Sequence, residues 1–480
     1  MILRTLFIVS TMVTVAWAQS PVGAKVETAP VPTSGDAADD PAIWVHPTDP
    51  SKSLVIATDK NAGLAVYDLA GRQLQFLSDD EPDNVDLRND FLLGGQRVTL
   101  LAASDRADNE IALYVLDPNT RTVRNVSARS IGTNVEIYGI CMYRSSTGNY
   151  YAFVTSKSGG LEQWRLFDDG SGKVDGQMVR SFDVGSDCEA CVADDETGFL
   201  FVAEETEGIW RYGAEPGAGT SRVQVDSTNG SLTADVEGLA LYYASGGRGY
   251  LIASSQGDNT FQVYDRQAPH THRFNFEIAS SGSIDGVTDC DGLEVMNRGL
   301  GSAFPQGMLV VQDGSNSGGN QNFKFVGWQD ISIAASPDLL VDPTYDPHVL
   351  VTCTSVASTT QRLGANALRL TSGNRPVLGS NWRVNLDCTG HSSTGTGWLF
   401  GYDRSSSGTV IPGAGEILVD ASSRRLFRVR TNHFGLNLPI DVAIPSNVSL
   451  CGTRIFAQGI CGGANHRVEL TNALDIVLGF

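Results

Sequence analysis

LVIATDKNAGLAVYDL, residues Leu54–Leu69, contains two apolar strands separated by a polar turn. β-Branched and aromatic residues fill both halves, and Asn61 and Gly63 mark the turn. Five later segments repeat this order of apolar strand, small residues, polar exit, turn and second strand. They begin at Val98, Tyr151, Phe199, Tyr250 and Met308.

The spacing of these six segments indicates a repeat architecture. Successive segments begin 44–58 residues apart, close to the roughly 40–50 residues of a four-stranded propeller blade. Helical periodicity is nearly absent, whereas the alternation typical of strands is common. A β-sandwich with the same number of strands would not explain the regular recurrence. The sequence therefore predicts an all-β chain with a six-bladed β-propeller over residues 19–335.

The residue that follows the first strand of each segment is polar or charged. Equivalent positions in propeller blades surround the central axis on one face, so these side chains are expected to face one cleft. In chain order they are Lys60, Arg106, Lys157, Glu205, Gln256 and Asp313. Three consecutive cations opposite two acids and an amide suit the binding of an anion together with a metal ion. Solvated charges in surface turns are the alternative interpretation.

Acidic side chains also precede the apolar strands. In GDAADDPAIWVHP, residues Gly35–Pro47, three aspartates come just before the apolar run Ala42–Val45. The same placement recurs at Asp83, Asn84, Asp86, Glu189, Asp235, Glu237, Asp291 and Glu294. Two like charges about 4 Å apart repel by ~4 kcal/mol at an effective dielectric constant near 20. Carboxylates crowded on one face therefore need protons or hard cations, and calcium, which binds about six to eight oxygens in loose geometry, suits them best.

Composition narrows the class of protein. The 480 residues include 54 Asp and Glu against 34 Lys and Arg, a net charge of −20, and 41% are hydrophobic. The hydrophobic content excludes a disordered acidic tail. The charge argues against binding nucleic acid or anionic lipid through the whole surface and favours a protein that collects cations.

The N-terminus has the features of a secretory signal over residues 1–18. Arg4 precedes the apolar run Leu6–Val15, and Ala16-Trp17-Ala18 forms a small-x-small cleavage site. No later segment is apolar over the about 18 residues that a transmembrane helix needs. We therefore predict a secreted protein (extracellular, periplasmic or on the cell surface) without a transmembrane segment.

Other site chemistries have little support in the sequence. Export permits disulfides among the eight cysteines, and Cys188-x-x-Cys191 is predicted to be structural because no βαβ pattern surrounds it. His270-x-His272 is a weak zinc signal, and no Gly-x-Ser-x-Gly motif is present.

Four motifs give the chain a family resemblance. They are DAADDPAIW at Asp36–Trp44, DNVDLR at Asp83–Arg88, DVEGL at Asp235–Leu239 and DGLEV at Asp291–Val295. These motifs resemble the signatures of the β-propeller phytases, which are secreted, calcium-dependent phosphatases that hydrolyse phytate, inositol hexakisphosphate. The second motif departs from the family pattern, which usually has Asn at the position of Asp83 and Tyr at the position of Asn89.

The resemblance implies roles for individual residues. It implies a phosphate pocket and catalytic site made of Lys60, Arg106, Tyr138, Lys157, Glu189 and Asp291. It implies calcium ligands at Glu27, Asp36, Asp40, Asn84, Glu189, Glu205, Asp235, Glu237, Gln256 and Asp291. The implied substrate is phytate or calcium-phytate, attacked by a water molecule that several calcium ions activate.

Residues 345–480 are rich in Gly, Ser, Thr and Asn and contain short alternating strands. With four cysteines, Cys353, Cys388, Cys451 and Cys461, this segment is predicted to be a small β-sandwich-like accessory domain. It is expected to serve stability, attachment to the cell surface or carbohydrate binding.

Two alternatives to a phytase remain open at this point. One is a calcium-stabilised propeller that acts as another hydrolase, such as a lactonase, although a neutral ester would not need three cations. The other is a non-enzymatic extracellular binding or adhesion module.

Overall fold

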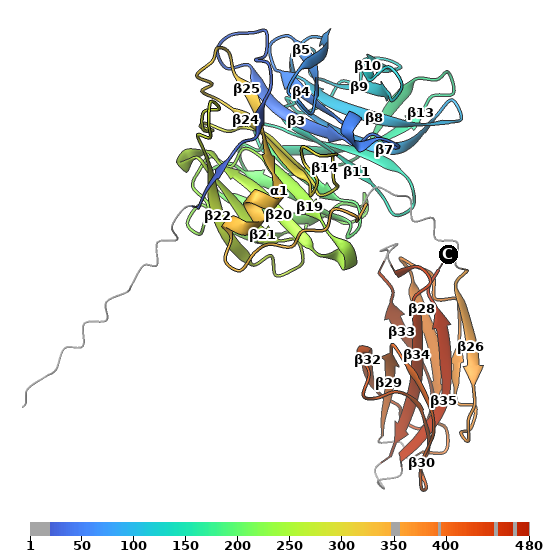
Figure 1. The fold of residues 1–480 in the computed structure, drawn as a ribbon. Helices are drawn as coiled ribbons and strands as arrows, with labels where there is room; N and C mark the ends of the chain where they lie inside the picture. The colour runs from blue at the N-terminus through green and yellow to red at the C-terminus, as the bar shows by residue number, and fades with distance from the viewer. Residues whose placement is uncertain (1–19, 347–355, 392–394, 446–449, 464–467, 480) are drawn as a thin grey trace, which may run out of the picture. The chain divides into compact units, whose positions relative to one another are not determined.

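The computed structural model describes residues 20–346, 356–391, 395–445, 450–463 and 468–479 (Figure 1). The predicted signal segment, residues 1–18, lies outside these ranges, as does Cys353. The chain divides into two compact units, one formed chiefly by residues up to 348 and the other chiefly by residues from 349 onward. Within the described ranges, none of the helices has the length and apolar character needed to cross a membrane.

Four sheets of the first unit each consist of four consecutive antiparallel strands. The first contains β3 (Ala38–Trp44), β4 (Leu54–Asp59), β5 (Gly63–Asp68) and β6 (Gln73–Ser78). The second contains β7 (Pro82–Leu93), β8 (Gln96–Asp105), β9 (Glu110–Asp117) and β10 (Thr122–Asn125). The third contains β11 (Ile140–Arg144), β12 (Tyr150–Thr155), β13 (Gly160–Asp168) and β14 (Val174–Asp183). The fourth contains β15 (Cys191–Asp194), β16 (Phe199–Glu204), β17 (Gly208–Gly213) and β18 (Val223–Ser227).

The last two sheets of this unit incorporate the N-terminal strands. The fifth contains β19 (Leu239–Tyr243), β20 (Gly249–Ser255), β21 (Thr260–Asp265) and β22 (His272–Ala279), and β1 (Ser20–Gly23) pairs in parallel with β22. The sixth contains β23 (Leu293–Met296), β24 (Met308–Asp313) and β25 (Asn322–Gly327), and β2 (Val26–Glu27) pairs antiparallel with β25. The N-terminal segment thus joins the last two sheets before the chain enters the first, which protects edges that would otherwise be open.

Short helical segments complete this unit. Helix α1 (Trp328–Ala334) follows β25, and three 3-10 turns span Pro50–Lys52, Ser245–Gly247 and Gln256–Asp258.

The first strands of the six sheets form a closed ring. β3 contacts β7, and the contacts continue through β11, β15, β19 and β23 back to β3. Neighbouring sheets share apolar cores, one of which joins Trp44 and Leu54 to Leu101 and Tyr114. Because both faces of a sheet are covered, β4 is buried at every position, and its sequence is a nearly continuous apolar run. The predicted all-β, propeller-like fold is confirmed.

The antiparallel register explains where the polar residues meet. Ala38 of β3 pairs with Asp59 of β4, and Pro82 of β7 pairs with Asp105 of β8. The beginning of each first strand therefore lies beside the end of the second strand in its sheet. Residues before the first strands and residues after the second strands consequently gather on one face of the ring.

The second unit is also all-β. A five-stranded sheet has the order β26 (Ser358–Arg362), β35 (Val468–Val477), β34 (Arg454–Gly462), β29 (Thr396–Tyr402) and β32 (Arg425–Asn432). A three-stranded sheet contains β27 (Leu370–Ser372), β28 (Asn381–Asp387) and β33 (Asn437–Ala443), and β30 (Ser405–Ile411) forms a hairpin with β31 (Gly415–Val419). Both sheets contribute to one core, as Trp382 and Leu399 illustrate, in agreement with the predicted sandwich-like build.

Two disulfides lie within the described residues. Cys141 is bonded to Cys191 in the first unit, and Cys388 is bonded to Cys461 in the second. Cys188 is buried and free. The Cys188-x-x-Cys191 pair is therefore structural, as predicted, because Cys191 is bonded elsewhere.

Candidate functional site

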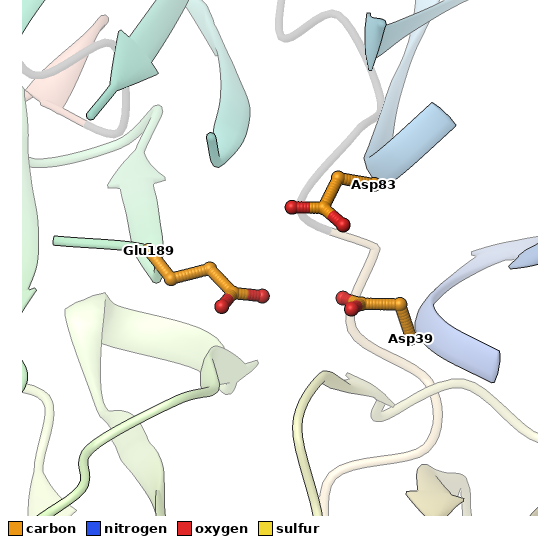
Figure 2. Close-up of side chains that lie close together, drawn as sticks. All are labelled: Asp39, Asp83 and Glu189. Carbon is orange, nitrogen blue, oxygen red and sulfur yellow. The ribbon is translucent and has the colours of Figure 1, made fainter. Parts of the chain in front are cut away.

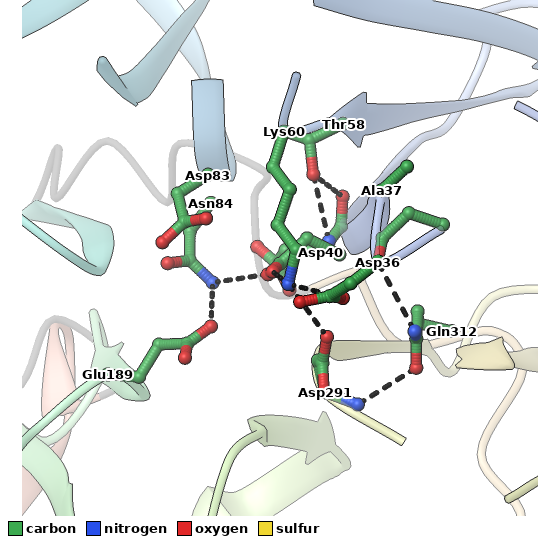
Figure 3. Close-up of polar contacts among 12 residues, drawn as sticks. Asp36, Ala37, Asp40, Thr58, Lys60, Asp83, Asn84, Glu189, Asp291 and Gln312 are labelled. Carbon is green, nitrogen blue, oxygen red and sulfur yellow. Dashed lines mark hydrogen bonds and ion pairs between the residues drawn. The ribbon is translucent and has the colours of Figure 1, made fainter. Parts of the chain in front are cut away.

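Lys60, directly after β4, connects three carboxylates. Its Nζ atom lies 2.9 Å from Oδ1 of Asp36, 3.0 Å from Oδ2 of Asp39 and 3.3 Å from Oδ2 of Asp291 (Figure 3). The Asp36 side chain is 74% exposed, whereas that of Asp39 is 1% exposed. Burial by itself lowers the pKa of Lys60, but Asp39 and Asp291 outweigh burial and raise the pKa. Lys60 is thus a permanent positive charge on this face.

Arg106, directly after β8, pairs with an acid that the sequence-based site did not include. Its Nη1 atom lies 3.1 Å from Oδ1 of Asp83, whose side chain is 0% exposed. Burial and the nearby Asp39 carboxylate raise the pKa of Asp83 well above its usual range. The Oδ2 atom of Asp83 is buried and has no hydrogen-bond partner. This carboxylate is therefore only partly compensated by Arg106.

Asp39, Asp83 and Glu189 form a compact carboxylate group. Each offers one oxygen, and the three oxygens lie within 4.8 Å of one another (Figure 2). They come from strands β3 and β7 and from the loop before β15, so the group exists only in the folded ring. Burial, followed by the charges of Asp39 and Asp83, raises the pKa of Glu189 well above its usual range. Such a group favours a bound cation or retained protons.

Glu189 is also part of a second group with Glu205 and Glu237, again within 4.8 Å. Burial and the charge of Glu237 raise the pKa of Glu205 to about 8. Burial raises the pKa of Glu237 to about 7, with Asp39 and Asp235 adding to the shift. Glu205, after β16, and Glu237, before β19, therefore lie close to Glu189, and the charge of Glu237 adds to the raised pKa of Glu189.

Asp291 and Gln256 are in direct contact. The Nε2 atom of Gln256 donates a hydrogen bond to Oδ1 of Asp291 over 2.8 Å. Burial and Asp39 raise the pKa of Asp291 well above its usual range, although Lys60 opposes the shift. Gly238 packs against the backbone here, because a Cβ atom on it would lie 2.6 Å from the Asp291 carbonyl oxygen.

Asp40 occupies a different part of the interior from its neighbour Asp39. Its Oδ2 atom accepts a hydrogen bond from the Val85 amide over 3.1 Å. Burial, followed by the charge of Asp39, raises the pKa of Asp40 well above its usual range. Asp40 lines a cavity that also includes Asn84 and Glu294. Because successive strand residues point to opposite sides, Asp39 and Asp40 serve different surroundings.

Asn84 connects Asp39 and Glu189. Its Nδ2 atom lies 3.4 Å from Oε1 of Glu189 and 3.5 Å from Oδ1 of Asp39 (Figure 3). Its Oδ1 atom is buried and has no hydrogen-bond partner. The amide therefore presents a free acceptor inside a carboxylate cluster.

Lys157 and Tyr138 form a pair beside the third sheet, with Tyr138 just before β11 and Lys157 just after β12. The Lys157 Nζ atom lies 4.2 Å from the centroid of the Tyr138 ring, a cation–π contact. Burial and the charge of Glu189 raise the pKa of Tyr138. The phenol thus keeps its proton at all physiological pH values and can donate a hydrogen bond.

Glu27 and Asp313 lie in a separate group around Lys324. The buried Lys324 Nζ atom is 2.8 Å from Oε2 of Glu27, 3.2 Å from Oδ2 of Asp313 and 2.5 Å from Oδ1 of Asp285. Its Nζ atom also lies 3.4 Å from Oδ1 of Asn316. Asp313 and Glu27 are therefore ion-paired with Lys324 and not with Lys60 or Arg106.

Sequence reasoning missed Asp39 and Asp83 as members of the central group. Both stand beside predicted ligands, Asp40 and Asn84, but a sequence does not reveal which of two adjacent acids faces the axis. Asp187, just before Glu189, was also missed; burial raises its pKa, and its buried Oδ1 atom has no hydrogen-bond partner.

The donor set fits a hard divalent cation. Every group is a carboxylate or amide oxygen, the ligand type that hard divalent ions prefer. Buried oxygens without a hydrogen-bond partner belong to Asp83, Asn84, Asp187 and Glu205. Unpaired buried oxygens are unfavourable unless a cation or another partner compensates them. Asp80, Asp105 and Asp108 form a further acidic group, in which Asp80 and Asp108 are exposed and Asp105 is buried.

Comparisons with known proteins point to one family. The family model described as Phytase matches residues 1–352. The 3-phytase of Bacillus subtilis (strain 168) is 46% identical over 331 residues, which cover 66% of this chain and 87% of the relative.

Among solved structures, "Crystal structure of BBS1N in complex with ARL6DN, soaked with mercury" matches with a TM-score of 0.37 and 11% identity over 64% of this chain and 98% of that chain. The same complex soaked with lead gives a TM-score of 0.36 and 12% identity over the same shares of the two chains. Similarities of this size carry no argument about function.

Proposed function

This chain belongs to the phytase family, and on that premise we propose that it is a phosphoric monoester hydrolase that releases phosphate from phytate. The observation that carries the proposal is the adjacency of fixed cations and crowded acids. Lys60 contacts Asp39 and Asp291, and Arg106 contacts Asp83. A site for a neutral substrate has no need of such charges.

We propose that the acids hold several calcium ions. The residues that would bind them are Asp39, Asp83, Asn84, Asp187, Glu189, Glu205, Asp235, Glu237, Gln256 and Asp291. Calcium, when bound, supplies a positive charge that polarises the phosphate ester and lowers the pKa of water. Asp36 and Asp40, at the exposed and interior margins of this group, are further candidate ligands, and Glu27 remains a candidate despite its contact with Lys324.

The side chains of the phosphate pocket have distinct roles in this proposal. Arg106 is suited to a bidentate contact with phosphate oxygens, while Lys60 and Lys157 add positive charge near the phosphate. Tyr138 donates a hydrogen bond because its pKa is raised. Phytate is a dense polyanion, and these groups offset its repulsion by the carboxylates.

A water molecule is the expected nucleophile. Because an activated water molecule can attack phosphorus directly, no nucleophilic side chain is needed and no covalent phosphoenzyme is expected. In this proposal the carboxylates of Glu189 and Asp291 accept protons or hold metal. We also propose that calcium-phytate serves as substrate, since calcium offsets the repulsion between the phosphates of phytate and the carboxylates of the site.

The decisive experiment measures phosphate release from phytate by the purified protein, with calcium and after chelation. We expect release that depends on calcium, and none from a simple lactone. Acid quenching should trap no phosphorylated protein. Calcium-independent release would remove the metal from the proposal, and lactone hydrolysis without phosphate release would replace the phytase with the alternative hydrolase.

We also propose that the protein is secreted, as the sequence of residues 1–18 suggests, and that the second unit contacts carbohydrate or a cell surface. N-terminal sequencing of the mature protein recovered from the culture medium tests the first proposal.

A further inference from the structure

The second unit has the opposite charge to the rest of the chain. Residues 351–480 contain 11 Arg, no Lys, and 7 Asp and Glu, giving a net charge of +4 within a chain of net charge −20. A basic module on an acidic enzyme indicates a partner that the remainder of the surface would repel.

A row of aromatic rings lies on one face of β29. Trp398, Phe400 and Tyr402 alternate with the buried residues of the strand and are each partly exposed. Their ring centroids lie 5.9 Å apart for the first pair and 6.5 Å apart for the second, and the ring planes differ by 13° and 25°. Rigid rings of this kind give contact area at a low cost in conformational entropy.

A row of arginines runs beside the rings. β32 is the edge strand beside β29 (Figure 1). In the register of these two strands, Arg430 pairs with Trp398 and Arg428 pairs with Phe400. The guanidinium carbons of Arg428 and Arg430 lie 5.4 Å and 5.2 Å from the Trp398 ring centroid. Both arginines are exposed, and neither forms an ion pair with any described residue. The sheet therefore presents an apolar track and a cationic track in parallel.

We propose that this face of β29 and β32 binds an acidic polysaccharide, a polymer of sugars that carry carboxylates. Each unit of such a polymer has an apolar ring face for the aromatic row and a carboxylate for the arginine row. The residues of each track recur every second position along a strand, a repeat of about 6.8 Å, so one extended polymer chain can contact more than one ring and both arginines. Arginine binds carboxylates in a planar, bidentate geometry.

Other partners fit this face less well. Phytate is compact and its ring is surrounded by phosphates, which leaves no apolar face for Trp398. A bilayer surface favours apolar side chains that protrude, whereas these rings are partly buried in a row along the strand. The proposal is independent of phosphatase activity and goes beyond it by giving the second unit a ligand class.

The test uses the full-length protein in affinity electrophoresis through gels that contain polygalacturonate or neutral galactan. We expect retardation in polygalacturonate that weakens with salt, and none in galactan. Arg428→Gln with Arg430→Gln, and separately Trp398→Ala, should weaken binding about tenfold each, by loss of ion pairs and of stacking. Arg375→Gln with Arg383→Gln removes the same charge from the three-stranded side and should leave binding unchanged.

Thermal unfolding of each variant checks that it is folded, and phosphate release from phytate should be the same in all of them. If the control double variant lost binding to polygalacturonate equally, net charge alone would explain the interaction, and the proposal would be overturned. Stronger binding to vesicles of phosphatidylglycerol than to polygalacturonate would assign the face to lipid instead. Absence of retardation in any acidic gel would also overturn the proposal, whatever the result with phytate.

Discussion

Arg106 and Asp83 form an ion pair of 3.1 Å in which the arginine side chain is 28% exposed and the aspartate is completely buried. The family resemblance places Asn at the position of Asp83. The pair therefore links Arg106 of the proposed phosphate pocket to a carboxylate at a position where the family resemblance implies an amide.

Asp83→Asn should weaken calcium binding and strengthen phytate binding. The variant removes one charge from the Asp39, Asp83 and Glu189 group and frees Arg106 from its partner. We expect calcium affinity to fall by about tenfold, as for the loss of ~1.4 kcal/mol, and KM for phytate to decrease. Calorimetric titration with calcium alone and steady-state kinetics measure the two effects. Unchanged calcium affinity would exclude Asp83 as a ligand.

Glu189→Gln should abolish activity. Glu189 belongs to both carboxylate groups, so the variant should weaken both proposed calcium sites at once, and we expect kcat to fall by roughly 100-fold or more. Glu215→Gln is the matched control: Glu215 accepts hydrogen bonds from Tyr143 and Ser145, each over 2.7 Å, and lies outside both groups. Activity retained in Glu189→Gln, or lost equally in the control, would contradict the assignment.

Lys60→Met should raise KM and also change stability in a calcium-dependent way. Loss of the ammonium removes the partner of Asp39 and Asp291, and breaking a buried ion pair typically costs about 3–5 kcal/mol. In chelator the variant should unfold at a markedly lower temperature than the wild type, and added calcium should recover most of the difference. A variant whose unfolding temperature does not respond to calcium would argue against cations beside Lys60.

Stability without calcium should decrease as the pH rises. Glu205 and Glu237 have pKa values of about 8 and about 7 in the folded protein, above their ordinary value of 4.5. Between about 4.5 and 8 the folded state therefore holds more protons than the unfolded state, so its stability is lost as the pH rises through this window. We expect the unfolding temperature in EDTA to drop by several degrees between pH 5 and pH 9.

Calcium should reverse that trend, since it replaces the protons on the same carboxylates and binds more tightly as they ionise. Stabilisation by calcium should accordingly be largest at about pH 9. Glu205→Gln should flatten the decline in EDTA, whereas Glu215→Gln should leave it unchanged. A decline of equal slope in both variants would place its origin elsewhere.

The prediction of the fold depended on local pattern. β4 reads as a continuous apolar run because sheets cover it on both sides, and that environment recurs at each segment that the repeat identified. The prediction of the exit residues followed from the same symmetry. Lys60 and Glu205 lie among the clustered acids, as this prediction expects. The Asp313 side chain instead pairs with Lys324 on the adjacent strand, and the repeat pattern does not reveal that partner.

The sequence by itself determined the repeat, the all-β class and the chemistry of the candidate site, because strand period and side-chain type are local properties of a chain. The tertiary structure alone decided which acids share a site. Asp39, Asp83 and Glu189 are separated by up to 150 residues along the sequence, and closure of the ring brings them within 4.8 Å. The raised pKa values of Asp83 and Glu189, and the preference of the group for a cation, arise from that proximity and from burial, which are properties of the folded ring and of no single segment.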